Sequence, residues 1–389
     1  MDHILATHEI VKTDFVRGDN CHLFDSHGRR FLDFESGIWS TSLGHGHPRV
    51  NAALRAQLDR IAHLGTRYPS PLAEAAAIAV LGILGMDDGK CLFLSSGSEA
   101  VEFAVQAARR VSGRPRLLTF RNSYLAAYGS AGRKPADEWL LIDPDDLGPD
   151  GPDARLSAIP FDDIGAFVFE PGGSGSAFVR FPPPELVAEI ASRVRRTGGL
   201  LVSNEVTTGM GRTGRWFGFE HFNLAPDIVT LGKGLGNGYP VSAVAMRPGP
   251  AAALEASGLV HAQSHQNDPL GCAVALAVIE TMREDGLVAR GAEVGATLLA
   301  GLRDLQARHP IVKEARGRGM LLGLELQPDE RLTAAAAYRR LLDEGCLVGY
   351  HAGGNLLRFD PALTIEREDL DILLDRLDAI LTAAEASAR

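Results

Sequence analysis

The sequence lacks long hydrophobic runs and runs of lysine or arginine. A membrane-spanning helix needs roughly 18–20 consecutive apolar residues, and no apolar run approaches that length. The formal net charge of −10 disfavours a nucleic acid as the main partner, because its backbone is itself negative. The first residues, MDHILATHEIVKTD, lack the basic and apolar regions of a signal peptide. We therefore expect a cytoplasmic protein with no membrane and no nucleic-acid partner.

Cysteine is also scarce, with 4 residues in a chain of 389. Their scattered positions do not match metal-site spacing, so we interpret them as reduced core thiols. His45 and His47 lie in a glycine-rich loop without a third ligand nearby, and we favour a loop-shaping role for them. No metal site is predicted. The cysteines are Cys21, Cys91, Cys272 and Cys346.

What the chain does contain is a regular alternation of short apolar strands and helices. Its length allows two or three lobes and a large core. The alternation predicts an α/β fold with a mostly parallel, doubly wound sheet, and ligands at the carboxyl ends of its strands. The strands expected in this sheet are Cys91–Leu94, Arg116–Phe120, Ile164–Glu170, Leu200–Ser203, Ile228–Leu231 and Val241–Met246.

Three regions are expected along the chain. Residues 1–44 hold two short strands and should pack, as part of a small α+β domain, with residues 266–389. Residues 45–265 should form the large domain. Within it, the segment from Tyr124 to Asp163 is rich in Ala, Gly, Pro and Asp, which predicts surface loops. From Asp268 the pattern is helical to about Arg308.

Two of the predicted strands end in polar residues. Leu200–Ser203 leads into Asn204-Glu205-Val206, and Ile228–Leu231 leads into Gly232-Lys233-Gly234. A lysine at the end of a buried strand is unusual, because burying an ammonium group is costly. A Schiff base between Lys233 and an aldehyde cofactor would explain it, and we favour that role over a purely structural one.

A further anion site is indicated at the start of a helix. The stretch SSGSEA, residues 95–100, follows a buried strand and opens a helix. Backbone N–H groups at a helix N-terminus bind anions such as phosphate. Ser96 and Glu99 also have the spacing of a capping box, which is compatible with phosphate binding.

The order of the motifs resembles the class III aminotransferases, which are fold type I enzymes dependent on pyridoxal 5′-phosphate. The layout is most similar to acetylornithine and ornithine aminotransferases, from about Val16 to Leu381. The resemblance implies a large domain carrying the cofactor, a smaller α+β domain, and a homodimer with its active site at the interface. The matching stretches are GRRFLDFESGI with LGHGHP, SSGSEAVEFA, FEP, NEVTTGMGRTG, PDIVTLGKGLGNGYP, DPLGCA, RGRGM and LRFDPALTI.

The resemblance also implies roles for individual residues around the cofactor. Lys233 would be the Schiff-base lysine and would shuttle a proton. Gly97 and Ser98 would hold the phosphate through backbone amides. Tyr124 would stack on one face of the ring and Val206 would press on the other, unless both are ordinary core residues. Ser264 falls where the family has a threonine that reaches the phosphate of the neighbouring subunit.

Two residues are implied on the substrate side. Arg358 falls on the arginine that binds a substrate carboxylate, and its planar fork matches that group. Trp39 lies in the loop that lines the substrate pocket. The alternatives are a surface ion pair for Arg358 and a core position for Trp39. The substrates themselves would be a small-molecule amino donor and acceptor.

Several residues depart from the family pattern. Asn204 replaces the aspartate that keeps the ring nitrogen protonated, and Thr207 replaces a glutamine near the ring hydroxyl. Gly175 stands where ornithine-type enzymes have a glutamate that shields the arginine, so Arg358 would stay available in both half-reactions. After Tyr124 the chain lacks the His-Gly-Arg that the family often has.

Asn204 leaves the reaction type open. An asparagine cannot supply the negative charge, and its absence weakens the ring as an electron acceptor. We favour an aminotransferase acting on a carboxylate-bearing amino acid or amine. The alternative is a lyase, racemase or γ-replacement enzyme of specialised metabolism. A third reading is a binding protein with little chemistry, which the combination of Lys233 and Arg358 disfavours.

Overall fold

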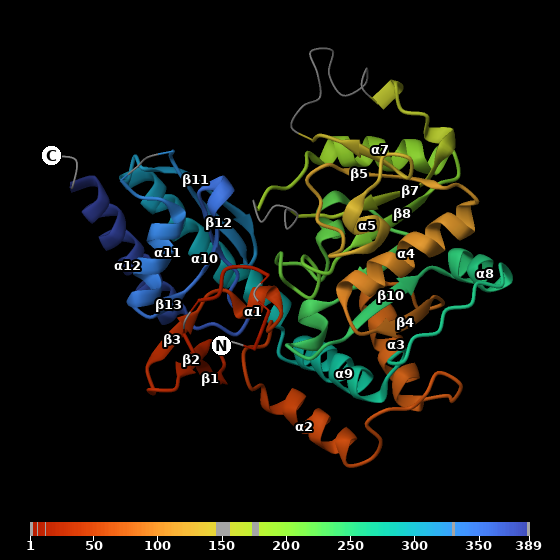
Figure 1. Cartoon of the computed structure of the whole chain (residues 1–389), viewed down its shortest axis with the longest axis horizontal. Coiled ribbons are helices and arrows are strands. Elements are labelled where there is room, and N and C mark those ends of the chain that lie inside the picture. The colour runs from red at the N-terminus through yellow and green to blue at the C-terminus, as the bar shows by residue number, and fades with distance from the viewer. Residues whose placement is uncertain are drawn as a thin grey trace.

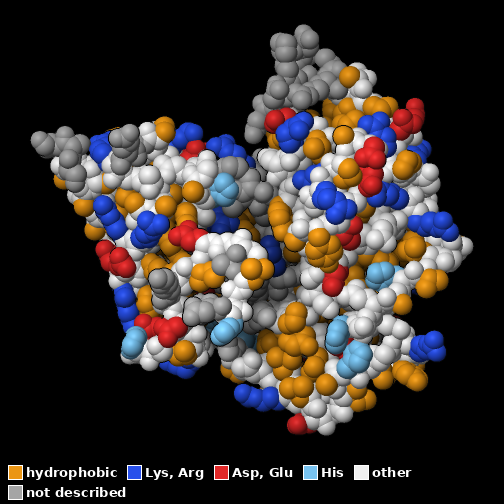
Figure 2. Space-filling model, viewed as in Figure 1, with side chains coloured by type: hydrophobic (Ala, Val, Ile, Leu, Met, Phe, Trp, Pro, Cys, Tyr) orange, Lys and Arg blue, Asp and Glu red, His pale blue; other side chains and the backbone are white. Residues whose placement is uncertain are grey.

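The protein has two lobes in the computed structural model, which describes residues 3–5, 7–11, 13–144, 156–172, 179–328 and 331–386. Figure 1 shows a larger lobe around a seven-stranded sheet and a smaller lobe built from both ends of the chain. Figure 2 shows that the surface is hollowed between the two lobes. The helix α9 (Pro269–Glu284) lies at their junction in Figure 1 and packs against α2, α3 and α10.

The large sheet has the strand order β4-β10-β9-β8-β7-β5-β6. Neighbouring strands from β9 to β6 are parallel, whereas β10 runs antiparallel to both β9 and β4. The α/β class and the mostly parallel sheet are therefore confirmed. The strands are β4 (Lys90–Leu94), β5 (Arg116–Phe120), β6 (Trp139–Ile142), β7 (Ile164–Phe169), β8 (Leu200–Asn204), β9 (Ile228–Leu231) and β10 (Ser242–Met246).

Helices cover both faces of this sheet. Every residue of β7 is buried, as expected for a strand between two helical layers. Ala166 and Val168 pack into the cluster around α4, and Phe167 and Phe169 into the cluster around α7. The helices of this lobe are α2 (Pro48–Leu58), α3 (Pro71–Leu84), α4 (Gly97–Ser112), α5 (Gly129–Arg133), α7 (Pro184–Arg196) and α8 (Pro248–Ala256), with short 3₁₀ turns at Phe161–Asp163, Gly218–Phe222 and Lys233–Gly236.

The small lobe contains two four-stranded sheets, β1-β2-β3-β13 and β11-β12-β15-β14. The short strand β13 pairs in parallel with β3, so Cys346 lies opposite Leu32 and the two ends of the chain share one sheet. The strands are β1 (Phe15–Asp19), β2 (His22–Asp25), β3 (Arg30–Asp33), β11 (Val312–Arg318), β12 (Leu321–Leu326), β13 (Cys346–Leu347), β14 (Gly349–His351) and β15 (Leu356–Phe359). The helices are α10 (Leu287–Arg308), α11 (Ala334–Asp343) and α12 (Arg367–Ala386), with a 3₁₀ turn at Ala352–Gly354.

One sequence-based expectation is wrong in part. The segment from Tyr124 to Asp163 is not all surface loop, because it contains α5 and β6, and Trp139 of β6 is buried. Its GPDGPD stretch lies outside the described residues. The predicted helical stretch from Asp268 to about Arg308 is confirmed and consists of two helices, which Gly286 separates with a φ of 62°.

None of the helices in the described part of the chain combines the length and the apolar character that a membrane span requires. All four cysteines are free thiols. Burial raises the pKa of Cys21 to about 12 and that of Cys272 to about 12, so these thiols stay protonated and unreactive.

Candidate active site

Lys233 lies just beyond the end of β9, at the edge of the sheet where the parallel strands end. Its Nζ donates a hydrogen bond to Thr207 Oγ1 at 2.8 Å and lies 4.4 Å from the centre of the Trp39 ring. Burial lowers the pKa of Lys233 to about 8, against the opposing effect of Glu170 and with the help of Arg358. A useful fraction of the amine is therefore neutral near pH 7 and can act as a nucleophile.

The backbone at Lys233 is strained. Its φ is 44°, a left-handed conformation that side chains other than glycine rarely adopt. The flanking glycines allow this turn to pack closely: a Cβ on Gly232 would lie 3.3 Å from Val206 Cγ1, and one on Gly234 would lie 2.7 Å from Ser42 Oγ. Strain of this kind is retained mainly where a side chain must be held in one place for function.

Asn204 is buried at the end of β8, and its amide group has a defined orientation. Its Oδ1 accepts hydrogen bonds from the Val206 N–H at 3.2 Å and from Thr230 Oγ1 at 3.3 Å. Its Nδ2 donates longer hydrogen bonds to the carbonyl oxygens of Tyr124 and Leu125, at 3.4 and 3.5 Å. These contacts suit an amide, since a carboxylate oxygen at the Nδ2 position would face two carbonyl oxygens without a proton to share.

The predicted anion site lies at the first turn of α4. Ser96 and Glu99 form a complete capping box there. The backbone N–H groups of Gly97 and Ser98 have no carbonyl partner within the helix, as at any helix N-terminus. A Cβ on Gly97 would lie 2.5 Å from Val206 Cγ1, so only glycine lets this turn approach the end of β8 so closely. The Ser98 hydroxyl accepts a hydrogen bond from the N–H of Ala127 at 3.0 Å.

Arg358, on β15 of the small lobe, points toward the same place. Its guanidinium carbon lies 4.4 Å from the centre of the Trp39 ring, so Trp39 contacts the cationic ends of both Arg358 and Lys233. Trp39 is held by the turn α1 (Ser36–Trp39), in which φ of all four residues is positive. Ile38 is β-branched, and its φ of 57° makes this turn a second site of backbone strain.

Two buried charged residues near Arg358 have no assigned role from the sequence. Asp360 follows β15 and is completely buried, which raises its pKa to about 6 although Arg358 and Arg212 oppose the shift. Burial lowers the pKa of Arg212 to about 10. Asp360 could have been found by the reasoning that singled out Lys233, since it is a polar residue directly after a buried strand.

Two glutamates belong to the surroundings of the site. Burial raises the pKa of Glu205, although hydrogen bonds to its carboxylate lower it. This carboxylate accepts hydrogen bonds from Ser203, Thr208, Gly218 and Phe219. Glu170 accepts a hydrogen bond from the Tyr124 N–H at 3.0 Å, which fixes the backbone of a residue whose side chain is half exposed.

Ser264 is not brought to Lys233 within one chain. It lies exposed in the turn before α9, and Asn267 at the end of that turn is bound to Phe93 of β4 through both its backbone and its side chain. No hydrogen bond found among the described residues joins Ser264 to Lys233 or to α4. Gly175, the position of the missing shielding glutamate, lies outside the described residues.

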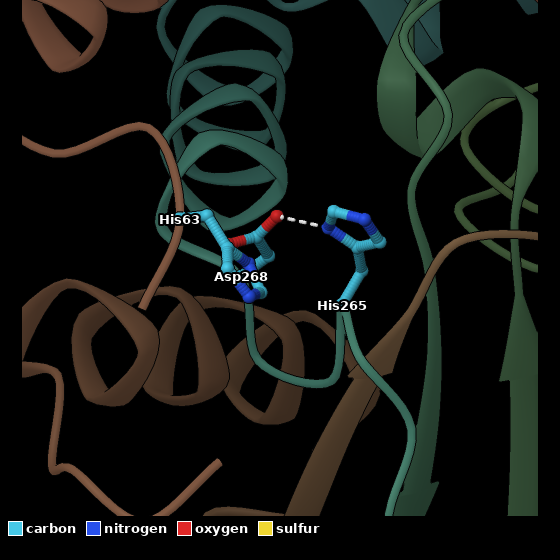
Figure 3. Close-up of side chains that lie close together, drawn as sticks. All are labelled: His63, His265 and Asp268. Atoms are coloured by element: carbon cyan, nitrogen blue, oxygen red, sulfur yellow. Dashed lines mark hydrogen bonds and ion pairs between the residues drawn. The ribbon is translucent and has the colours of Figure 1, made fainter. Parts of the chain in front are cut away.

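Histidines form two arrangements outside the Lys233 site. Figure 3 shows His63 and His265 on either side of Asp268, the one group in the described part of the chain with the make-up of a metal site. Their Nδ1 atoms lie 3.0 and 2.7 Å from different oxygens of Asp268, so hydrogen bonds account for this arrangement. In the glycine-rich loop, His45 Nε2 lies 2.7 Å from Asp33 Oδ2 and anchors the loop to the end of β3.

Comparison with known proteins gives matches along almost the whole chain. The sequence profile described as aminotransferase class-III matches residues 5–127 and 154–381. The acetylornithine aminotransferase of Mycobacterium tuberculosis is 36% identical over 375 residues, covering 94% of this chain and 91% of that protein. The acetylornithine aminotransferase of Streptomyces coelicolor is 34% identical over 380 residues, covering 96% and 92%.

Solved structures agree with these sequence matches. An S-selective transaminase from Arthrobacter sp. has a TM-score of 0.90 at 26% identity, covering 99% of this chain and 97% of that chain. An amine transaminase from an uncultivated Pseudomonas species, in its PLP-bound form, has a TM-score of 0.84 at 29% identity, covering 98% and 97%.

Proposed function

This chain belongs to the class-III aminotransferases, and we propose that it moves the amino group of a carboxylate-bearing amino acid or amine to a small-molecule acceptor. The observation that carries the proposal is the shared environment of Lys233 and Arg358. A buried amine with a lowered pKa and a guanidinium for a carboxylate both contact Trp39. Lys233 Nζ and the guanidinium carbon of Arg358 each lie 4.4 Å from the centre of the Trp39 ring. This arrangement suits a substrate with an amino group at one end and a carboxylate at the other.

The residues around Lys233 fit pyridoxal 5′-phosphate. The first turn of α4 offers the N–H groups of Gly97 and Ser98 to a phosphate, and the glycine at position 97 leaves room beside Val206. When bound, the cofactor supplies a carbonyl group that captures amines and a ring that withdraws electrons from the bonds of the substrate. We propose that Val206 and the half-exposed Tyr124 contact the two faces of this ring.

The side chains then have separate tasks. Lys233 in its neutral form accepts a proton at Nζ and returns it, as general base and general acid. Thr207 holds Nζ in place through its hydrogen bond. Arg358 binds the substrate carboxylate and so fixes the orientation of the substrate carbon toward Nζ. Trp39 covers the space between the two cations and excludes water from it.

Asn204 is proposed to face the nitrogen of the cofactor ring. One of its amide N–H groups would exchange its long bond to the Tyr124 or Leu125 carbonyl for a bond to an unprotonated ring nitrogen, which leaves the ring neutral and a weaker electron acceptor. The cost is on the order of 2–4 kcal/mol of transition-state stabilisation in a proton-abstraction step. A lyase, racemase or γ-replacement enzyme was the alternative motivated by this residue, and the similar proteins favour an aminotransferase.

We also propose a homodimer in which Ser264 completes the phosphate site of the partner subunit. The exposure of Ser264 supports this, because a residue that serves a neighbouring subunit must lie at the surface. Figure 2 shows hydrophobic side chains gathered on the large lobe around α2. Exposed apolar residues in and between α2 and α3 include Leu58, Ile61, Tyr68 and Ile78. A cytoplasmic location stays a prediction, supported by the four free thiols.

The test is the first half-reaction. The holoenzyme is mixed with single amino acids and amines, and the cofactor spectrum and the released product are followed. We expect conversion of the cofactor to its pyridoxamine form with release of a keto acid or aldehyde. Turnover of a donor while the cofactor keeps its aldehyde form would instead indicate a lyase or racemase. Asn204→Asp in the same assay should react faster, by up to roughly 10²-fold, if the asparagine limits proton abstraction.

A further inference from the structure

Arg358 is buried, yet the described residues give it no hydrogen bond. Its side chain is 8% exposed, and its Nε has no partner. A buried guanidinium without hydrogen bonds is costly, so such a group is expected to meet a ligand. Gly349 on the adjacent strand β14 leaves it room, because a Cβ there would lie 2.8 Å from Arg358 Nη2.

Among the described residues, Glu35 has a carboxylate within ion-pair distance of this guanidinium, and the buried Asp360 is a second acid that interacts with it. The Oε1 of Glu35 lies 3.9 Å from Arg358 Nη2, within the range of an ion pair but too far for a hydrogen bond. Glu35 is the residue before the strained turn that carries Trp39, and the Trp39 N–H donates to its carbonyl oxygen. The carboxylate caps no helix and is 22% exposed, so it can move. From the sequence, Arg358 is expected to stay available because Gly175 replaces the family's shielding glutamate, and Glu35 is a different acid that lies beside Arg358 in the structure.

Burial and two neighbouring carboxylates oppose the ionisation of Glu35, whereas Arg358 favours it. Burial raises its pKa to about 7, Arg358 pulls it back, and Asp33 and Asp360 raise it further. Burial raises the pKa of Tyr338 on α11 to about 12, and the charge of Glu35 adds to this shift. Asp33 is held by His45 and by the N–H groups of residues 35 and 36, and Asp360 is completely buried. Glu35 is thus the acid of this group that can respond to a ligand.

We propose that Glu35 competes with the substrate carboxylate for Arg358 and takes up one proton from solvent when that carboxylate binds. This rests on the proposed function, in which Arg358 receives the carboxylate. An arriving carboxylate would lie close to Glu35, and two like charges beside one guanidinium repel each other. Protonation of Glu35 removes the repulsion and frees Arg358 for the substrate.

The direction of the pH dependence follows from linkage. Below about pH 7, Glu35 of the unliganded protein is already protonated. Binding of the carboxylate then takes up almost no proton, and its affinity does not change with pH. Above about pH 7, the proton must come from solvent, and the affinity falls as the pH rises. The fall is at most tenfold per pH unit and ends when the pH exceeds the pKa of Glu35 in the complex.

The experiment is titration calorimetry of the holoenzyme with glutarate, a dicarboxylate that has no amine or ketone and cannot react with the cofactor. Measurement in buffers of different ionisation enthalpy gives the protons taken up on binding. At pH 8 we expect uptake approaching one proton for the natural chain and none for Glu35→Gln. We also expect Glu35→Gln to bind glutarate about tenfold more tightly at pH 8 and about equally at pH 6.

Two controls complete the design. Glu255→Gln removes the same charge from an exposed pair with Lys90 and should leave both uptake and affinity unchanged. Arg358→Met should abolish glutarate binding. Uptake that persists in Glu35→Gln, binding without uptake in the natural chain, or no binding in either protein would overturn the proposal. Each of these results is compatible with conversion of the cofactor to its pyridoxamine form in the half-reaction assay. The aminotransferase function is therefore tested independently of the role of Glu35.

Discussion

Arg212 and Arg358 are both buried arginines close to Asp360, but their surroundings differ. The guanidinium of Arg212 donates to the carbonyl oxygens of Met320 and Pro361 and to the hydroxyls of Ser36 and Ser42. The guanidinium of Arg358 makes no hydrogen bond among the described residues, and its neighbours are the ring of Trp39 and the carboxylates of Glu35 and Asp360. Arg212 thus links neighbouring segments through its hydrogen bonds, whereas the guanidinium of Arg358 is available to bind a ligand.

The difference follows from the backbone around each arginine. Arg212 lies between Gly211 and Gly214, both with φ near 80°, in a loop that brings it against the turn after β11 and the segment after β15. Carbonyl groups at the ends of elements can turn toward a side chain in this way. Arg358 lies within β15, whose carbonyl groups pair with β12 and β14. Its acceptors must therefore come from side chains or from a ligand.

The largest expected effect is on the stability of Arg212→Met. Removing this guanidinium leaves four acceptors without their donor and Asp360 without one of its two neighbouring arginines, and we expect a loss of about 3–5 kcal/mol in the free energy of unfolding. Urea unfolding followed by fluorescence measures it. An unchanged unfolding midpoint would show that Arg212 is not the structural member of the pair.

Arg358→Met should show the opposite pattern. We expect about a 10²-fold loss of kcat/KM for donors with a carboxylate, since a charge-assisted bidentate contact is lost. Amine donors without a carboxylate should be much less affected, and the loss of unfolding free energy should be smaller than in Arg212→Met. Equal losses for both kinds of donor would place the carboxylate elsewhere.

Asn204→Asp tests whether the cofactor side is built for an amide. In the cofactor-free protein we expect a loss of roughly 1–3 kcal/mol in unfolding free energy, because a carboxylate cannot donate to the Tyr124 and Leu125 carbonyls. Thermal unfolding with and without cofactor measures this, and the cofactor should restore part of the loss. A more stable cofactor-free variant would contradict the assigned orientation of Asn204.

The smallest effect concerns Thr207→Val. Lys233 has a pKa of about 8 because of burial, so the rate at which cofactor-free protein captures pyridoxal 5′-phosphate should rise as the pH rises through 8. The Thr207 hydroxyl accepts from the ammonium form and favours it. Its removal should move the midpoint of the pH profile to lower pH by less than about one unit. A shift to higher pH would mean that Thr207 favours the neutral amine.

Much of the sheet could be predicted from the sequence because β7, β8 and β9 are apolar runs that end in polar residues. The antiparallel direction of β10 could not, since an apolar run has no marker of direction. The strand β6 was missed because its WLLI lies in a segment rich in Gly, Pro and Asp. The local composition predicted a loop, but these residues form a strand because they pair with β5.

The candidate site divides in the same way. Lys233 and Asn204 lie in neighbouring motifs at strand ends and could be identified in the sequence. Glu35 and Arg358 are 323 positions apart by their residue numbers (358 − 35 = 323), and their approach depends on packing within the small lobe. Burial and charge of such a pair are tertiary properties, so neither residue type nor spacing predicts that Glu35 faces the guanidinium.

Lys233 is proposed to be the covalent anchor of the cofactor. The holoenzyme would be reduced with borohydride, which fixes the cofactor to its lysine, then digested and mapped by mass spectrometry. We predict a pyridoxyl group on Lys233 alone. The other lysines of the chain are Lys12, Lys90, Lys134 and Lys313. A pyridoxyl group on one of these, or on no lysine of a cofactor-loaded active protein, would contradict the role proposed for Lys233.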